Sequence, residues 1–231
     1  MALNLDNKYT VDLSGEKLGR GTFGIVYLGA KVSDKQQVAV KQCEVSKDTD
    51  GQLAASELKN FQHLERHPHV VKLLDFFYRR KSFWMVLQYC DGGNLEKFIC
   101  ENNPTMDVKF NLLYQTSSAI HYMHNLQKYI VHRDIKPTNV LIMKQDGEFV
   151  VKVTDFGLSK VVDDQNPATT HLFHTRCGTE GYMAPEFFLQ EGDYNYSRPV
   201  DIFSLGLVFA ALVQHQNGSK ILFPVIGKLQ I

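Results

Sequence analysis

Residues 132 to 139 read His-Arg-Asp-Ile-Lys-Pro-Thr-Asn, and Asp-Phe-Gly follows at residues 155–157. The first segment brings Asp134, Lys136 and Asn139 within six residues of one another, and Asp155 adds a second carboxylate. These side chains are polar or titratable and lie at short spacing, so they are the first candidates for functional residues.

Length and charge limit the classes of protein to consider. The chain has 231 residues, 44% of them hydrophobic, which is enough for one two-lobed domain or two small domains. Its 25 basic and 25 acidic residues leave no formal net charge. We therefore expect no bulk attraction to nucleic acid or to an anionic membrane, and any phosphate site should be local.

The ends and the cysteines favour an intracellular protein. The first ten residues contain no apolar run of signal-peptide length, and the apolar segment 202–213 is too short to span a bilayer. The four cysteines form no C-x-x-C pair, which favours reduced thiols over disulfides or a zinc site. We expect a cytoplasmic location, with the nucleus as the alternative.

The two halves of the chain differ in periodicity. Segments 25–28, 38–40 and 83–87 are short and rich in β-branched and aromatic residues, which predicts strands, and residues 52–66 predict one helix among them. After residues 92–93 the pattern becomes helical, over 108–125 and again from Ser197 to Val213. We expect a lobe or domain at 8–91 and another at 92–231, with the hinge at Gly92-Gly93.

Residues 19–26 form a glycine-rich segment. Its first six positions are Gly19, Arg20, Gly21, Thr22, Phe23 and Gly24. Glycine lacks a side chain, so backbone amides there can approach phosphate oxygens closely. The same spacing occurs in dinucleotide-binding folds, but it opens a helix in those folds. Here a strand follows, which favours a phosphate-covering hairpin, while an ordinary structural turn is the alternative for this segment taken alone.

Lys41 follows the apolar segment 38–40, where a surface lysine is the simplest interpretation. Glu57, however, shares a helical face with Phe61 and Leu64, so its carboxylate should point inward and require a cation. Lys41 is the candidate partner for that carboxylate.

These features together resemble the eukaryotic protein kinase family. Residues 132–139 match the family's catalytic loop at every defining position, and residues 155–157 match its Asp-Phe-Gly motif. Residues 177–186, Cys-Gly-Thr-Glu-Gly-Tyr-Met-Ala-Pro-Glu, resemble its substrate-facing loop. The resemblance implies an α+β, two-lobed fold, with a small β-rich lobe containing one helix and a larger, mainly helical lobe.

The resemblance also implies roles for individual residues, with ATP and Mg²⁺ as cofactors. Asp134 would accept the proton of the substrate hydroxyl, Lys136 would steady the transferred group, and Asn139 and Asp155 would hold Mg²⁺. Lys41, paired with Glu57, would hold the nucleotide phosphates. The remaining nucleotide-binding residues would be Leu18, Val26, Ala39, Leu87, Gln88, Cys90 and Leu141.

Lys136 and Thr179 follow the serine/threonine pattern of the family, so a protein serine or threonine is the expected acceptor. Arg133 precedes the catalytic aspartate, as in kinases whose activation segment carries a regulatory phosphate. Thr175 is the first candidate site for that phosphate, which an upstream kinase would add, and Thr169 and Thr170 are the next candidates. An unphosphorylated, exposed threonine is the alternative.

The chain ends earlier than the family pattern does. Glu186 would lack its usual arginine partner, and the apolar helix that begins near Ser197 would be partly uncovered. We therefore expect an incomplete larger lobe. The alternative function is a truncated, catalytically inactive module that binds a nucleotide or a partner.

Overall fold

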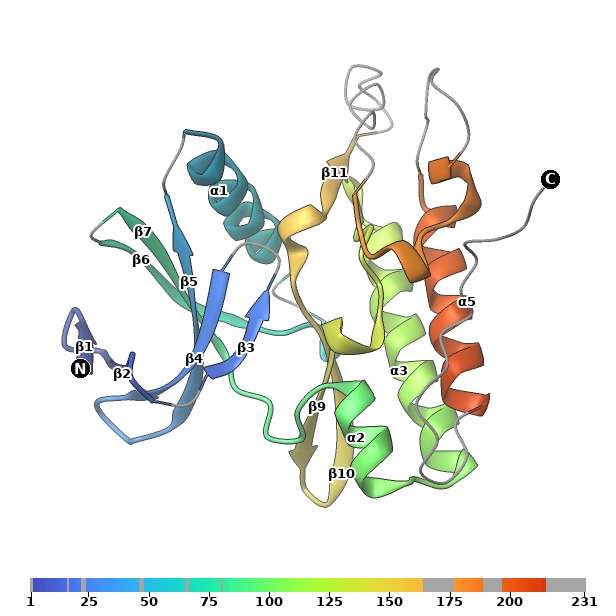
Figure 1. Cartoon of the computed structure of the whole chain (residues 1–231), viewed down its shortest axis with the longest axis horizontal. Helices are drawn as coiled ribbons and strands as arrows, with labels where there is room; N and C mark the ends of the chain where they lie inside the picture. Colours follow the sequence, from blue (N-terminus) through green and yellow to red (C-terminus); the bar gives the residue numbers. More distant parts are fainter. Residues whose placement is uncertain are drawn as a thin grey trace. The chain divides into compact units, whose positions relative to one another are not determined.

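The computed structural model describes residues 2–15, 17–21, 24–45, 48–64, 67–79, 81–163, 177–188 and 197–214. The chain divides into two compact units (Figure 1). Unit 1 comprises residues 1–66, 70–91 and 155–157, and unit 2 comprises residues 67–69, 92–154 and 158–231. The main division thus falls after Asp91. Two short segments depart from this division. Residues 67–69 precede it but belong to unit 2, and residues 155–157 follow it but belong to unit 1.

Unit 1 is built on a seven-stranded antiparallel sheet. Its strands are β1 (Ala2–Leu5), β2 (Tyr9–Asp12), β3 (Lys17–Gly21), β4 (Gly24–Lys31), β5 (Gln37–Glu44), β6 (Leu73–Arg79) and β7 (Ser82–Gln88). The order is β1-β2-β4-β5-β7-β6, and β3 also pairs with β4. The segments 25–28, 38–40 and 83–87 are confirmed as the cores of β4, β5 and β7, whereas β1, β2 and β6 had not been predicted.

Strand β5 separates two environments because side chains alternate between the faces of a strand. Val38 and Val40 are fully buried in an apolar cluster. Lys41, the next residue, is also buried but takes part in ion pairs. One face of β5 is therefore core, and the other carries a charge.

Helix α1 (Asp48–His63) is the helix of unit 1 (Figure 1). It begins four residues earlier than residue 52 and ends at His63, before the predicted end at residue 66. The predicted start was late because Gly51 was treated as a boundary. A glycine inside a helix costs only about 1 kcal/mol, which packing can offset.

Unit 2 is mainly helical. Its described helices are α2 (Leu95–Asn102), α3 (Met106–His124) and α5 (Pro199–Gln214). It also has two two-stranded antiparallel sheets: β9 (Val140–Gln145) pairs with β10 (Glu148–Val153), and β8 (Tyr129–Val131) pairs with β11 (Lys160–Val162). The side chains of Asn94 and Thr105 cap the first turns of α2 and α3. Short 3₁₀ turns occupy Pro137–Asn139, Phe156–Leu158, Glu180–Tyr182 and Pro185–Phe188, of which the second begins in unit 1.

Helix α5 has one buried and one exposed side. Val200, Asp201 and Val208 are buried, whereas Ile202 and Phe209 are 54% and 42% exposed. The sequence predicted an apolar helix in this region, and α5 confirms the helix.

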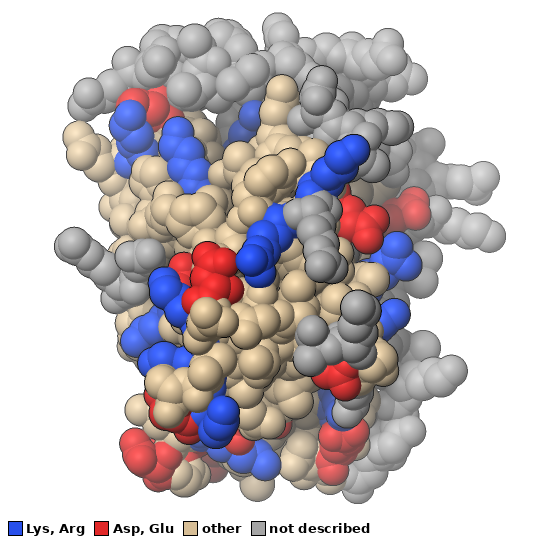
Figure 2. Space-filling model, turned by 90° about the vertical axis from the view of Figure 1, so that its left-hand side faces the viewer, with Lys and Arg blue, Asp and Glu red and all other residues tan. Residues whose placement is uncertain are grey.

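The surface carries charges of both signs. On the face shown in Figure 2, basic and acidic side chains are interspersed, as expected for a chain with no formal net charge. Within the parts of the chain that the structure describes, no helix is both long and apolar enough to cross a membrane.

Candidate active site

Lys41 is the centre of a buried charge cluster in unit 1. Its Nζ lies 2.6 Å from Oε1 of Glu57 and 2.8 Å from Oδ1 of Asp155. Burial disfavours the charged ammonium, but the two carboxylates outweigh it and raise the pKa of Lys41 above its ordinary value. Lys41 is therefore a fixed cation in this structure, and Glu57 is its partner as the helical pattern indicated.

Asp155 is held in place by the residues around it. Its backbone has φ of 64°, and the next residue, Phe156, packs its ring edge-on against Phe61 of α1 with centroids 4.9 Å apart. Nδ2 of Asn60 donates to the carbonyl of Phe156 at 3.2 Å. Asn60 was not singled out in the sequence, although it is buried and lies three positions after Glu57 on the same helix.

The glycine-rich segment forms a hairpin of β3 and β4, as the strand after Gly24 predicted. A Cβ atom on Gly24 would lie 1.9 Å from the carbonyl oxygen of Gln42, so only glycine fits there. A Cβ atom on Gly19 would meet nothing within 4 Å. Thr22 and Phe23 lie outside the described residues.

The remaining expected nucleotide-binding residues belong to both units. In unit 1, Ala39 is paired across the sheet with Leu87, and Val26 with Lys41. Leu18 is 39% exposed on β3. Gln88 ends β7, and Cys90 is buried two residues later, whereas Leu141 lies on β9 of unit 2.

Unit 2 contains a second polar cluster around Asp134. The hydroxyl of Thr179 donates to Oδ1 of Asp134 at 2.7 Å, and Nζ of Lys136 lies 2.7 Å from Oδ2. Lys136 also donates to the Thr179 hydroxyl at 2.6 Å. Nδ2 of Asn139 donates to Oδ2 of Asp134 at 2.9 Å and to its carbonyl at 2.8 Å. Three side chains, from residues 132–139 and 177–186, thus converge on the carboxylate of Asp134.

Asp201 fixes the backbone that carries this cluster. Its two carboxylate oxygens accept hydrogen bonds from the amides of His132 and Arg133, both at 2.8 Å. Oδ2 also lies 2.8 Å from Nε2 of His124. His124 and Asp201 lie 77 positions apart, so their contact could not be read from the spacing of the sequence.

Comparison with known proteins identifies the family of the chain. A family model described as protein kinase domain matches residues 13–220. The chain belongs to the protein kinase family. Its α+β architecture, with a β-rich unit carrying one helix and a mainly helical unit, is the fold that this membership implies.

Several curated serine/threonine kinases resemble this kinase chain. It is 33% identical to CBL-interacting serine/threonine-protein kinase 10 of Arabidopsis thaliana, over 97% of this chain and 46% of the relative. It is 34% identical to myosin light chain kinase A of Dictyostelium discoideum, over 84% of this chain and 63% of the relative. The chain thus spans about half to two thirds of the length of these relatives.

The expected regulatory residue of this kinase, Arg133, lies beside the Asp134 cluster. Its backbone has φ of 65°, and its Nε donates to the carbonyl of Leu158 at 2.6 Å. Burial and the charge of Arg133 lower the pKa of Lys160, a second cation that the sequence did not single out. Thr175, the expected phosphate site, lies outside the described residues.

Proposed function

We propose that this chain is a protein serine/threonine kinase that transfers the γ-phosphoryl group of ATP to a protein hydroxyl with the help of Mg²⁺. The observation that carries the proposal is the set of contacts at Asp134. Its carboxylate is bonded to a hydroxyl, an ammonium and an amide, those of Thr179, Lys136 and Asn139. A carboxylate held in this way can accept a proton from an attacking hydroxyl at a defined position.

The hydroxyl of Thr179 supports the choice of acceptor. It donates a hydrogen bond to Oδ1 of Asp134, the carboxylate to which a substrate hydroxyl would donate its proton. It also accepts a hydrogen bond from Lys136. An aliphatic hydroxyl therefore fits beside Asp134, which favours serine or threonine. Lys136, with its charge beside this hydroxyl, would steady the transferred phosphoryl group.

The donor set fits a hard cation. Both hydrogens of the Asn139 amide nitrogen are directed at Asp134, which leaves its amide oxygen to bind a metal. Asp155 adds a carboxylate, and oxygen ligands of these two kinds suit Mg²⁺. When bound, Mg²⁺·ATP supplies the phosphoryl group and neutralises its charge. Asn139 and Asp155 would hold the metal in this assignment.

Lys41 would bind the nucleotide phosphates. Its charge is maintained in a buried position by Glu57, whose contact at 2.6 Å also orients the ammonium. The hairpin of β3 and β4 would bring backbone amides to the same phosphates, and Gly24 keeps that hairpin close to β5.

The test is transfer of radiolabelled phosphate from ATP to a generic protein substrate by the purified chain. We expect Mg²⁺-dependent label on serine or threonine, and a loss of at least about 10²-fold in Asp134→Ala and in Lys41→Met. The controls are Lys59→Met, which changes an exposed lysine, and Glu148→Ala, which changes an exposed carboxylate. Equal label in all variants, or label that persists without Mg²⁺, would contradict the proposal and favour a non-catalytic binding module.

Phosphorylation of the activation segment is a separate part of the proposal. We expect a phosphate on Thr175, added by an upstream kinase, to pair with Arg133 and raise activity. Thr175→Ala should then remain at the activity of the unphosphorylated chain after incubation with an activating kinase. Full activity of this variant would exclude the role of Thr175.

A further inference from the structure

The N-terminal hairpin is a part of unit 1 that the proposed chemistry does not use. It consists of β1 and β2, and it precedes residue 13, where the match to the family model begins. The turn between the strands places Asp6 and Asn7 at φ of 51° and 58°. Asp and Asn tolerate this left-handed conformation, and the side chain of Asn4 accepts a hydrogen bond from the Asn7 amide at 2.7 Å.

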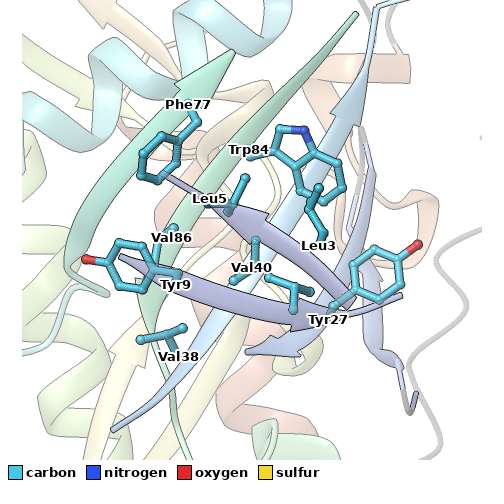
Figure 3. Close-up of a cluster of buried hydrophobic side chains, with 10 residues drawn as sticks. Leu3, Leu5, Tyr9, Tyr27, Val38, Val40, Phe77, Trp84 and Val86 are labelled. Atoms are coloured by element: carbon cyan, nitrogen blue, oxygen red, sulfur yellow. The ribbon is translucent and has the colours of Figure 1, made fainter. Parts of the chain in front are cut away.

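The hairpin presents one apolar face to the sheet. Leu3, Leu5, Tyr9 and Val11 are buried, whereas the residues between them in each strand point to solvent. The apolar side chains join one cluster with Tyr27, Val38, Val40, Phe77, Trp84 and Val86 (Figure 3). Leu5 is completely buried in this cluster. The hairpin therefore forms part of the core of unit 1.

Polar contacts fasten the hairpin to the far edge of the same sheet. Arg79, at the end of β6, donates to the carbonyl of Asn4 at 2.6 Å and lies 3.7 Å from Asp6. Lys8 forms an ion pair with Asp75 of β6 at 3.1 Å. Because β1 and β6 are the two ends of the strand order, the hairpin links the edges of a curled sheet.

This cluster lies against the strand that carries the proposed phosphate-binding lysine. Val38 and Val40 belong to β5 and point into the cluster, and Lys41 follows Val40 in the chain. The position of β5 therefore depends on what fills the space over Val38 and Val40. Nζ of Lys41 lies 2.6 Å from Glu57 and 2.8 Å from Asp155. A shift of the strand by a fraction of an ångström would disturb both contacts.

We propose that Leu3 and Leu5 are positioning residues for nucleotide binding: the hairpin holds β5 at the depth at which Lys41 meets Glu57 and Asp155. This inference rests on the proposed function, because it assigns Lys41 to the phosphates of ATP. It predicts that a cavity under the hairpin weakens ATP binding in protein that is still folded.

The test uses Leu5→Ala in the full chain and separates ATP binding from folding. We expect KM for ATP to rise about tenfold and KM for the protein substrate to stay within about twofold. Leu112→Ala, a buried leucine in α3 of unit 2, is the matched control. A variant that only lowers the folded fraction reduces the maximal rate and leaves both KM values unchanged, which we expect for Leu112→Ala.

Two further variants keep the inference testable if Leu5→Ala does not fold. Leu5→Val makes a smaller cavity and should raise KM for ATP by a smaller factor, whereas Leu5→Met, which preserves the volume, should restore the wild-type KM. An unchanged KM for ATP in folded Leu5→Ala or Leu5→Val would overturn the inference.

The wild-type chain distinguishes failure of the inference from failure of the proposed function. If it transfers phosphate and the leucine variants keep their KM for ATP, only the inference fails. If it binds the non-hydrolysable analogue AMP-PNP with Mg²⁺ without transferring phosphate, the Kd for AMP-PNP replaces KM with the same expected tenfold change. If it neither binds nor transfers, the proposed function and the inference both fail.

Discussion

The carboxylate of Asp201 accepts several hydrogen bonds in the interior of unit 2. It is completely buried and receives two backbone amides of the loop that precedes Asp134, with His124 on one of the same oxygens. One of these amides belongs to Arg133, whose φ is positive. Because one carboxylate accepts hydrogen bonds from both amides, the loop should depend on this residue.

We expect Asp201→Ala to lower the free energy of unfolding by about 3 kcal/mol, because it leaves two buried amides without acceptors. Urea denaturation followed by circular dichroism measures this change. Glu101→Ala, which removes an exposed carboxylate paired with Lys97 at 3.8 Å, should change it by less than about 0.5 kcal/mol. Equal effects of the two substitutions would contradict the anchoring role.

Thr179 makes a different kind of contact, because its hydroxyl bonds both to Asp134 and to Lys136. We expect Thr179→Val to lower kcat by about tenfold, the equivalent of one net hydrogen bond of about 1.4 kcal/mol. Thr179→Ser keeps the hydroxyl and should stay close to wild type. A Thr179→Val enzyme with wild-type kcat would show that the hydroxyl has no part in orienting Asp134.

At the scale of the element, the hairpin of β3 and β4 depends on Gly24 more than on Gly19. Gly24→Ala would force a Cβ atom against the backbone of Gln42, whereas Gly19→Ala meets open space. We expect Gly24→Ala to cost about 2 kcal/mol of stability and Gly19→Ala less than about 1 kcal/mol. Chemical denaturation of the two variants is the measurement, and similar midpoints would contradict the close approach of β4 to β5.

The loop of residues 67–69 is anchored within unit 2 by its side chains. The His67 ring stacks on Tyr122 with centroids 4.8 Å apart, and its Nδ1 accepts the amide of His69 at 3.2 Å. Nδ1 of His69 lies 3.3 Å from the carbonyl of Val151. The ammonium of Lys152 donates to the carbonyl of Pro68. A buried cation therefore lies beside two histidines.

This arrangement predicts a pH dependence of stability. Burial lowers the pKa of His67 and of His69 below 6.5, and the charge of Lys152 adds to the effect. The unfolded chain therefore binds more protons than the folded one just below pH 6.5, so stability is complete above that pH and falls as the pH decreases toward the folded pKa values. The double variant His67→Gln/His69→Gln should flatten this slope in denaturation curves between pH 7 and pH 5. An unchanged slope would show that His67 and His69 do not cause the pH dependence of stability.

At the scale of the whole molecule, the two units are not consecutive pieces of chain. The backbone passes from one unit to the other at 66/67, 69/70, 91/92, 154/155 and 157/158. Within unit 2, the amide of Thr154 donates to the carbonyl of Asn139 at 3.0 Å, directly before the chain enters the segment of Asp155. Because a ligand that binds only the folded state stabilises it, a nucleotide with Mg²⁺ should raise the stability of the protein.

We expect Mg²⁺·AMP-PNP at about one hundred times its Kd to add about 2.7 kcal/mol of stability, which raises Tm by about 5–10 °C. Lys41→Met should lose most of this shift, and chelation of Mg²⁺ should reduce it. Thermal unfolding followed by intrinsic fluorescence measures the shift. An equal Tm shift in wild type and Lys41→Met would show that Lys41 does not contribute to nucleotide binding.

The sequence by itself determined the family, because the motifs that identify it lie in short contiguous segments. Residues 132–139 and 155–157 predicted the kinase family and the two-lobed α+β fold before any contact was known. The pairing of Lys41 with Glu57 could also be predicted, since a carboxylate on an apolar helical face requires a cation. Helix ends were less accurate, as α1 shows, because packing can offset the cost of a residue such as Gly51.

Only the tertiary structure decided which distant residues support those groups. The contact of His124 with Asp201 spans 77 positions, and the bond from Asn60 to Phe156 spans 96. The burial of Leu5 in one cluster with Val40 depends on a sheet in which the N-terminal hairpin also contacts β6. Such contacts leave no periodic signal in the chain, since they depend on where whole strands and helices lie after folding and not on the spacing of neighbouring residues.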